Sequence, residues 1–301
     1  MPGVLVQSNP ISGRGRGPRL AERVCDALSR AGFEPLQHHD APANLPAPLL
    51  LSDTLHAVVV VGGDGTVRDL AQRMCEVGPP SRWKPILPVP LGTANLMARH
   101  LDYPDDASRA PEVVVEAIRR NIVRHLDAGT VNGKLFLLMA GVGVDAWIVH
   151  ELARRRRGPI SKFSYVRPAF ASLRHYRFHP LSVRLDGRDV FGPEPAIVFV
   201  ANVPEYGTGV PMLPGARSDD GVLDVLIVPT RSQVRVAATF VLAAVRKHVQ
   251  LPGAILRRAT HIEIDSEPSL PVQVDGDAAG HTPVRIELLP LRLPFIVAPK
   301  A

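Results

Sequence analysis

The sequence predicts an α/β domain built on a doubly wound parallel sheet, followed by a largely antiparallel β domain. In the first half, short β-branched runs alternate with helical stripes, a pattern typical of doubly wound sheets that bind ligands at the carboxyl ends of their strands. From Ile122 onward the pattern changes to short strands separated by turns. The 301 residues are enough for two domains, each with its own core.

Composition narrows the class of protein. The formal net charge of +6 favours an anionic partner such as a nucleotide or an anionic membrane. The two cysteines have no metal-ligand spacing, and the first residues lack the pattern of a signal peptide. The longest apolar run, Leu135 to Val144, is far shorter than the ~20 residues that span a bilayer. We therefore expect a cytoplasmic protein that binds no nucleic acid, since no RNA-binding motif or DNA-reading helix is present.

The first strand, Val4–Val6, leads into a loop, 9–15, that is rich in Gly, Ser and Arg. Such a loop can hold phosphate, although a plain flexible loop is the alternative. A helix follows, with an apolar stripe from Leu20 to Ala31, and then a second strand near Glu34–His38. This strand–helix–strand order is what a doubly wound domain requires.

The central stretch of the sequence is Val58–Val61, whose four β-branched residues predict a strand buried on both faces. Gly62-Gly63-Asp64-Gly65-Thr66 follows it, and an apolar helical stripe begins at Val67. Free N–H groups and the helix dipole favour phosphate at such a turn. Because phosphate repels a carboxylate, we expect Asp64 to hold Mg²⁺ or to handle a proton. The alternative is an ordinary strand-to-helix turn.

A third turn of the same type follows the strand that begins at Ile86. Gly92, Thr93 and Asn95 lie between this strand and a short helix that begins near Leu96. A helix over 113–120 closes the first domain.

The second domain is predicted from turn signals and short strands. Asn132-Gly133 lies between apolar runs and is a strong hairpin signal. The expected strands are 181–186, 188–191, 196–201, 222–228, 261–265, 272–274 and 284–289. The longer helix is expected from Gln233 to Val249, with one face that includes Val234, Val241 and Val245.

The Gly-Gly-Asp-Gly-Thr run resembles the signature of the diacylglycerol kinase catalytic domain family, which includes bacterial lipid kinases and sphingosine kinases. NAD kinases and phosphofructokinases share a version of it. Two other segments are similar to motifs of the family, Asn-Pro-x-Ser-Gly near the amino terminus and Pro-x-Gly-Thr-x-Asn before the short helix. The resemblance implies nucleotide contacts at Asn9, Pro10, Ser12, Gly13, Gly62, Gly63, Asp64, Gly65, Thr66, Gly92, Thr93 and Asn95. Leu96 departs from the Asp that diacylglycerol kinases commonly have after this Asn.

Three motifs of the second half also resemble the family. Gly141–Ala146 is similar to its Gly-x-Gly-x-Asp-Ala turn. The segment 214–224 resembles one that holds a structural Mg²⁺ in some bacterial members. That resemblance implies ligation by the Asp220 carboxylate and by the carbonyls of Arg217 and Val222. An Asp-Gly turn without metal is the alternative.

Asp275-Gly276-Asp277 resembles the family's Asp-Gly-Glu, in which the Glu is the proposed base that takes the proton from the lipid hydroxyl. The resemblance assigns this role to Asp277, whose side chain is shorter by one C–C bond of about 1.5 Å. Asp64 and Asp277 are thus the predicted catalytic residues.

The resemblance implies an NAD kinase- or phosphofructokinase-like nucleotide domain over 1–127, completed by a carboxyl-terminal strand in 291–301, and a β-sandwich lipid domain over 128–290. The predicted activity is ATP-dependent transfer of the γ-phosphoryl group to a lipid alcohol, diacylglycerol or a related lipid, with Mg²⁺ as cofactor and ATP as co-substrate. Two alternatives stay open: a kinase of a soluble substrate such as NAD, and a non-catalytic nucleotide- or lipid-binding protein. The sequence defines no oligomeric state.

The run Arg154–Arg157 precedes an aromatic-bearing segment, 163–173. Cations near a membrane attract anionic lipid by about 1 kcal/mol each, so this run predicts a peripheral contact with an anionic membrane, at the inner membrane face. A solvated helix end is the alternative.

Overall fold

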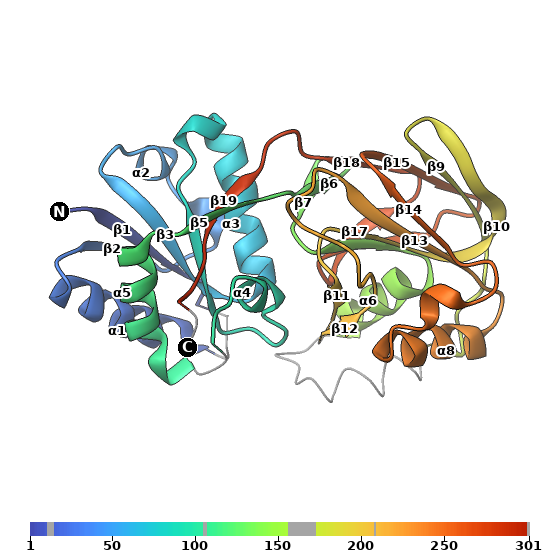
Figure 1. The fold of residues 1–301 in the computed structure, drawn as a ribbon, viewed down its shortest axis with the longest axis horizontal. Helices are drawn as coiled ribbons and strands as arrows, with labels where there is room; N and C mark the ends of the chain where they lie inside the picture. Colours follow the sequence, from blue (N-terminus) through green and yellow to red (C-terminus); the bar gives the residue numbers. More distant parts are fainter. Residues whose placement is uncertain (11–14, 105–106, 156–172, 208, 300–301) are drawn as a thin grey trace. The chain divides into compact units, whose positions relative to one another are not determined.

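The computed structural model describes residues 1–10, 15–104, 107–155, 173–207 and 209–299. The backbone contacts divide the chain into two compact units (Figure 1). Unit 1 comprises Met1–Leu126 and Leu291–Ala301, and unit 2 comprises Asp127–Pro290. The chain therefore crosses into unit 2 and returns to unit 1 with its last strand.

Unit 1 is built on a six-stranded sheet with the order β2-β1-β3-β4-β19-β5. Its strands are β1 (Gly3–Ser8), β2 (Glu34–His38), β3 (Leu55–Gly62), β4 (Ile86–Pro90), β5 (Val123–Leu126) and β19 (Leu293–Ile296). All pairs are parallel except the pair of β19 with β5. The carboxyl ends of β1, β3 and β4 therefore meet at one edge of the sheet.

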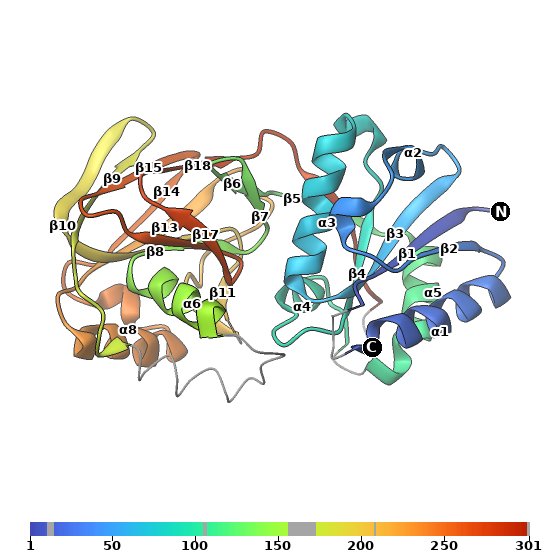
Figure 2. The same cartoon turned by 180° about the vertical axis from the view of Figure 1, so that it is seen from behind.

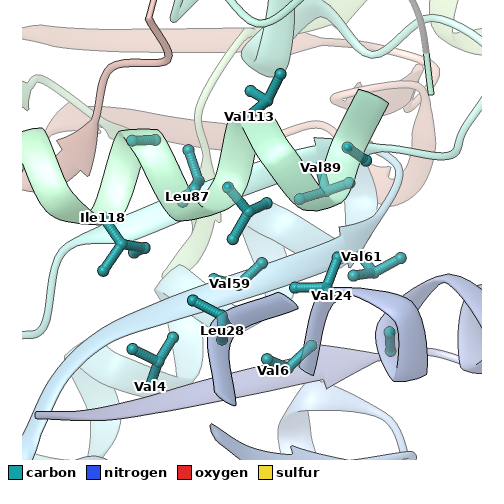
Figure 3. Close-up of a cluster of buried hydrophobic side chains, with 14 of the residues drawn as sticks. Val4, Val6, Val24, Leu28, Val59, Val61, Leu87, Val89, Val113 and Ile118 are labelled. Atoms are coloured by element: carbon teal, nitrogen blue, oxygen red, sulfur yellow. The ribbon is translucent and has the colours of Figure 1, made fainter. Parts of the chain in front are cut away.

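Helices cover both faces of this sheet, as the sequence predicts (Figures 1 and 2). They are α1 (Gly17–Arg30), α2 (Ala47–Leu50), α3 (Asp64–Val77), α4 (Leu96–His100) and α5 (Ala110–Arg120). Val24 and Leu28 of α1 and Ile118 of α5 belong to the same buried hydrophobic cluster as Val59 and Val61 of β3 (Figure 3). Side chains alternate along a strand, so Val58 and Val60, fully buried as well, point to the opposite face, where α3 contacts β3.

Eleven strands of unit 2 form two antiparallel sheets that share the long strand β10, and β11 with β12 forms a separate two-stranded pair. Its strands are β6 (Gly129–Val131), β7 (Lys134–Phe136), β8 (Met139–Val142), β9 (Pro180–Leu185), β10 (Arg188–Ala201), β11 (Glu205–Tyr206), β12 (Val210–Pro211), β13 (Leu223–Pro229), β14 (Ile255–Ala259), β15 (His261–Ser266), β16 (Pro271–Val274), β17 (Asp277–His281) and β18 (Val284–Leu288). The first part of β10 pairs with β9, and the part from Ala196 pairs with β8 and β13. One core lies between the sheets.

A second core of unit 2 lies between one sheet and its helices, α6 (Val144–Arg155) and α8 (Gln233–Ala244). Ile197 and Phe199 of β10 are fully buried there, next to Val236 and Phe240 of α8. Both helices lie on the same side of the sheet in Figures 1 and 2. This arrangement confirms an α/β domain combined with an antiparallel β domain.

The helix predicted to reach Val249 ends earlier, at Ala244. Arg246 has a φ of +58°, and the N–H groups of Arg246 and Lys247 donate to the carbonyls of Ala243 and Leu242. These two bonds form a Schellman-type end, which is hard to foresee because the left-handed position is usually Gly or Asn. The prediction was therefore wrong about where this helix stops.

Across the described ranges, no helix combines the length and the apolar character that crossing a membrane requires.

Candidate functional site

The first group of candidate residues lies at the carboxyl edge of the unit 1 sheet. Asn9 and Pro10 follow β1, while Ser12 and Gly13 lie outside the described residues. The Gly62–Thr66 turn joins β3 to α3, and the loop with Thr93 joins β4 to α4. The parallel sheet thus brings three loops from distant parts of the sequence to neighbouring positions.

Two of these loops touch through their glycines. A Cβ placed on Gly92 would lie 2.7 Å from the Gly63 Cα, and a Cβ on Gly63 would lie 3.2 Å from the Gly92 Cα. The Leu91 N–H donates to the Gly62 carbonyl at 2.9 Å, which fixes the loops against each other. Only glycine permits this backbone contact, so the glycines serve packing as well as the approach of a ligand.

Asn95 shapes the second loop from within. Its Oδ1 accepts from the Gly92 N–H at 2.7 Å, and its Nδ2 donates to the Gly92 carbonyl at 3.1 Å. The residue has a φ of +52°, a left-handed conformation that Asn tolerates better than most residues. Leu96, where diacylglycerol kinases commonly have Asp, is buried. At this position the chain therefore has a buried apolar side chain in place of a carboxylate.

Asp64 connects the two loops. It lies in the first turn of α3, and its Oδ1 accepts from the Met97 N–H at the start of α4, at 2.9 Å. Burial raises the pKa of this carboxyl above its usual value, while hydrogen bonds from the backbone of Met97, Leu96 and Asn95 act in the opposite direction. One carboxylate oxygen thus has a structural partner that the sequence does not reveal. Its assignment to Mg²⁺ or to proton transfer stays a prediction.

The second group of candidate residues lies in unit 2, at the turn between β16 and β17. Asp275 has a φ of +49°, and its N–H donates to the Met139 carbonyl at 2.9 Å. Its Oδ1 accepts from the N–H groups of Leu138 and Met139, each at 2.9 Å. Its Oδ2 accepts from the Leu137 N–H, also at 2.9 Å. The turn that presents Asp277 is therefore anchored to the loop before β8.

A buried polar network supports the same turn. The Gln273 Oε1 accepts from the Gly276 N–H at 2.9 Å, and the Gln273 Nε2 donates to the Asp145 Oδ2 at 3.1 Å. The Tyr206 hydroxyl donates to the Asp145 Oδ1. Asp145 is 1 % exposed, and burial raises its pKa to about 6 despite these two donors. A chain of contacts thus runs from Tyr206 to the turn before Asp277.

Gly141 makes room for this network. A Cβ at this position would lie 2.3 Å from the Asp145 Oδ2 and 2.8 Å from the Gln273 Nε2. Gly143 has a φ of +96°, which few other residues adopt. These two glycines give the Gly-x-Gly-x-Asp spacing a physical reason: the first gives the carboxylate space, and the second turns β8 into α6.

The third group of candidate residues is the predicted structural metal segment. The Asp220 Oδ1 is buried without a hydrogen-bond partner, and its Oδ2 lies 3.8 Å from the Arg258 Nη1. Arg258 also pairs with Asp224, at 3.2 Å. The described residues contain no cluster of three or more His, Cys, Asp or Glu arranged to hold a metal. A site there would rely on Asp220 and carbonyl oxygens, as the resemblance implies.

Sequence reasoning assigned no role to the residues that hold the turn of Asp277. In the sequence Asp275 is only part of a motif, and no pattern indicates a function for Tyr206 or Gln273. One signal was available: Gln273 is a polar residue between Val272 and Val274 in a strand of otherwise apolar residues, and it is 1 % exposed.

Half of the predicted basic run lies outside the described residues. Arg154 is in the last turn of α6 and forms an ion pair with Glu151. Arg156, Arg157 and the aromatic segment from Phe163 lie outside the described ranges. The membrane contact assigned to this run stays a prediction.

Comparison with protein families gives two matches that together cover most of the chain. Residues 3–131 match the diacylglycerol kinase catalytic domain, and residues 139–297 match the YegS C-terminal NAD kinase beta sandwich-like domain. The two matched regions contain the loops of unit 1 and the turn of Asp277 in unit 2. They define the class of protein as a kinase of the lipid-kinase type.

Curated relatives match most of the chain. A diacylglycerol kinase of Staphylococcus carnosus is 26% identical over 279 residues, covering 91% of this chain and 88% of the relative. One of Staphylococcus haemolyticus is 27% identical, covering 91% of this chain and 82% of the relative. A crystal structure of a putative diacylglycerol kinase from Bacillus anthracis has the same fold, with a TM-score of 0.77 at 23% identity over 99% of this chain and 96% of that one. The chain belongs to the diacylglycerol kinase family.

Proposed function

We propose that this kinase transfers the γ-phosphoryl group of ATP to the hydroxyl of a lipid alcohol, diacylglycerol or a related lipid. The observation that carries the proposal is the anchored Asp275–Asp277 turn in a chain whose relatives are named diacylglycerol kinase. Phosphoryl transfer depends mainly on positioning and on electrostatic stabilisation, and a rigid turn supplies positioning.

The nucleotide is assigned to the loops of unit 1. The Gly62–Thr66 turn places backbone N–H groups at the start of a 14-residue helix, where the dipole favours phosphate. The loop with Gly92 and Thr93 packs on this turn and is itself exposed, so it is available to a ligand. Asn9 and Pro10, together with Ser12 and Gly13, complete the proposed nucleotide contacts.

The acceptor is assigned to Asp277. The lipid hydroxyl oxygen forms the new bond to the γ-phosphorus, the bond from that phosphorus to the β–γ bridging oxygen breaks, and ADP leaves. The hydroxyl proton passes to the Asp277 carboxylate. The network from Tyr206 through Asp145 and Gln273 would hold the base in place, because it fixes Gly276 directly before it.

Magnesium is proposed for two places. When bound with the nucleotide, it neutralises phosphate charge, and Asp64 is the carboxylate of this region that the proposal assigns to it. The structural site fits the residues present, because the Asp220 Oδ1 is a buried carboxylate oxygen without a partner and a hard cation prefers such a ligand. The carbonyls of Arg217 and Val222 would complete the ligand set from the protein.

The test is transfer of radiolabelled phosphate from ATP to a panel of lipid alcohols in mixed micelles. Asp277→Asn should lower kcat by about 10²–10⁴-fold with little change in nucleotide affinity, because positioned proton transfer contributes about that factor. Asp277→Glu restores the residue of the family and should retain activity. Wild-type turnover of Asp277→Asn would remove Asp277 from the mechanism.

One observation favours a second candidate, a kinase of a soluble substrate. The match to unit 2 is described as an NAD kinase beta sandwich-like domain. Including NAD among the acceptors of the same assay decides between them: labelled NAD without labelled lipid would replace the proposal. Nucleotide binding with no transfer to any acceptor would favour a non-catalytic binding protein.

A further inference from the structure

Helix α8 of unit 2 is apolar on two opposite sides. Val236, Thr239 and Ala243 are buried against the sheet. Val234 is 79% exposed, Val241 67% and Val245 61%. With 3.6 residues per turn, Val241 and Val245 lie roughly 20° to either side of Val234 around the helix axis, opposite the buried side. Val245 is the C-cap residue that follows the last turn of α8.

Such a helix is unusual on a protein surface. Helices that are apolar all round are normally buried, whereas surface helices have a polar outer side. The described part of the chain has eight exposed large hydrophobic residues, and three of them are these valines. A continuous apolar stripe indicates a binding surface, because single exposed hydrophobic residues are normal but patches are not.

The charges around α8 indicate which partner covers the stripe. No Asp or Glu occurs from Val225 to Ile262. Arg246 and Lys247 are exposed directly after the helix, and neither forms an ion pair with another described residue. Arg231 precedes the helix and pairs with Glu194 at 3.8 Å, so it contributes less uncompensated positive charge to this surface. The apolar stripe therefore ends in free positive charge.

A second copy of the chain does not fit this surface. Two copies packed stripe to stripe would bring Arg246 and Lys247 near the cations of the other helix without any acid to pair with them. An anionic membrane supplies both an apolar interior and negative headgroups, which is what an interfacial helix binds.

We propose that the outer face of α8, formed by Val234, Val241 and Val245 together with Arg246 and Lys247, lies in the surface of anionic membranes and brings the enzyme to its substrate. This inference rests on the proposed lipid substrate. It differs from the membrane contact predicted at Arg154–Arg157, because it assigns the apolar insertion to a separate helix.

The test is co-sedimentation of the full chain with vesicles of phosphatidylcholine alone or in about equal parts with phosphatidylglycerol. Replacing the three valines by Ser should weaken binding to the mixed vesicles by roughly tenfold or more. Arg246→Gln with Lys247→Gln should weaken it by about fivefold per cation at low salt, with a smaller difference at high salt. All five side chains are exposed, so the melting temperature should not change.

Matched controls come from other surfaces of the chain. Ile122 is 54% exposed in unit 1, and Ile122→Ser should leave vesicle binding unchanged. Arg30 of α1 and Arg188 of β10 are exposed cations on other elements, and Arg30→Gln with Arg188→Gln tests charge loss in general. The proposal would be overturned if the wild-type chain does not bind vesicles, or if it binds pure phosphatidylcholine vesicles and mixed vesicles equally. If the wild-type chain is a dimer and the valine variant is a monomer, the outer face of α8 serves self-association. That result would also overturn the membrane proposal.

Turnover separates this inference from the proposed function. The valine variant should lose activity on long-chain diacylglycerol in vesicles but keep activity on a short-chain diacylglycerol dispersed in water. If no lipid is phosphorylated, the proposed function fails, while the vesicle-binding series still decides the role of α8.

Discussion

Asp64 in unit 1 and Asp275 in unit 2 both follow a strand at a glycine-containing turn, and both bind backbone N–H groups of another segment. Asp64 reaches 33 residues along the chain to the start of α4. Asp275 accepts three N–H groups that lie 136 to 138 residues away. The first contact connects two neighbouring loops of unit 1, and the second joins two distant strands of a sandwich. Two similar motifs thus have different roles: the Asp64 carboxylate lies where a ligand is expected, and the Asp275 carboxylate stabilises the fold.

The largest expected effect is that of Asp275→Asn on stability. An amide has one acceptor oxygen, so it cannot accept from Leu137 on one side and from Leu138 and Met139 on the other. At least one backbone N–H group would face another donor, and the free energy of unfolding of unit 2 should fall by about 3–5 kcal/mol. Urea unfolding followed by tryptophan fluorescence measures this loss.

The same substitution should lower turnover, because the turn that presents Asp277 would no longer be fixed. A variant that unfolds at the wild-type urea midpoint would show that these three hydrogen bonds contribute little, and the contrast with Asp64 would disappear.

The second expected effect is a pH dependence from Asp145. Its folded-state pKa of about 6 lies above that of an unfolded aspartate, so the folded chain binds more protons between about pH 4 and 6. The stability that Asp145 contributes is fully present at low pH and is lost as pH rises through this window, by about 2–3 kcal/mol. Asp145→Asn should lack this component, because its amide does not titrate.

The difference in unfolding free energy between wild type and Asp145→Asn, measured from pH 4 to 8, isolates this group from the other acids with raised pKa values, Asp64 and Asp224. The variant keeps good hydrogen bonding, since the Tyr206 hydroxyl can accept from the amide while Gln273 donates to it. A difference that is constant over this range would contradict a raised pKa for Asp145.

The smallest expected effect on stability is that of Asp64→Asn. The Asn oxygen can still accept from the Met97 N–H. Removing a partly buried charge also offsets part of the stability that the substitution costs. We expect a change of about 1 kcal/mol or less, typical of a helix cap. Turnover and the affinity for Mg²⁺-ATP should both fall, as measured by calorimetry with the nucleotide. Unchanged nucleotide affinity would leave Asp64 with a structural role alone.

The sequence by itself determined the class of fold and the positions of the motifs. Val58–Val61 predicts a buried strand because β-branched residues without polar neighbours belong in the middle of a parallel sheet, and all four are fully buried. The change from helical stripes to short strands after Ile122 likewise indicates where the second kind of domain begins. These inferences succeed because hydrophobic periodicity is local: it depends on residues within a few positions of one another.

Only the tertiary structure decided which side chains support the candidate site. Gln273 meets Asp145 across 128 residues of sequence, and Asp275 meets the loop before β8 because β16 pairs with β8. The outer face of α8 was predicted as one apolar face, but its exposure depends on which side of the helix packs on the sheet. No local pattern encodes such pairings, because they follow from the register of strands that are distant in the chain.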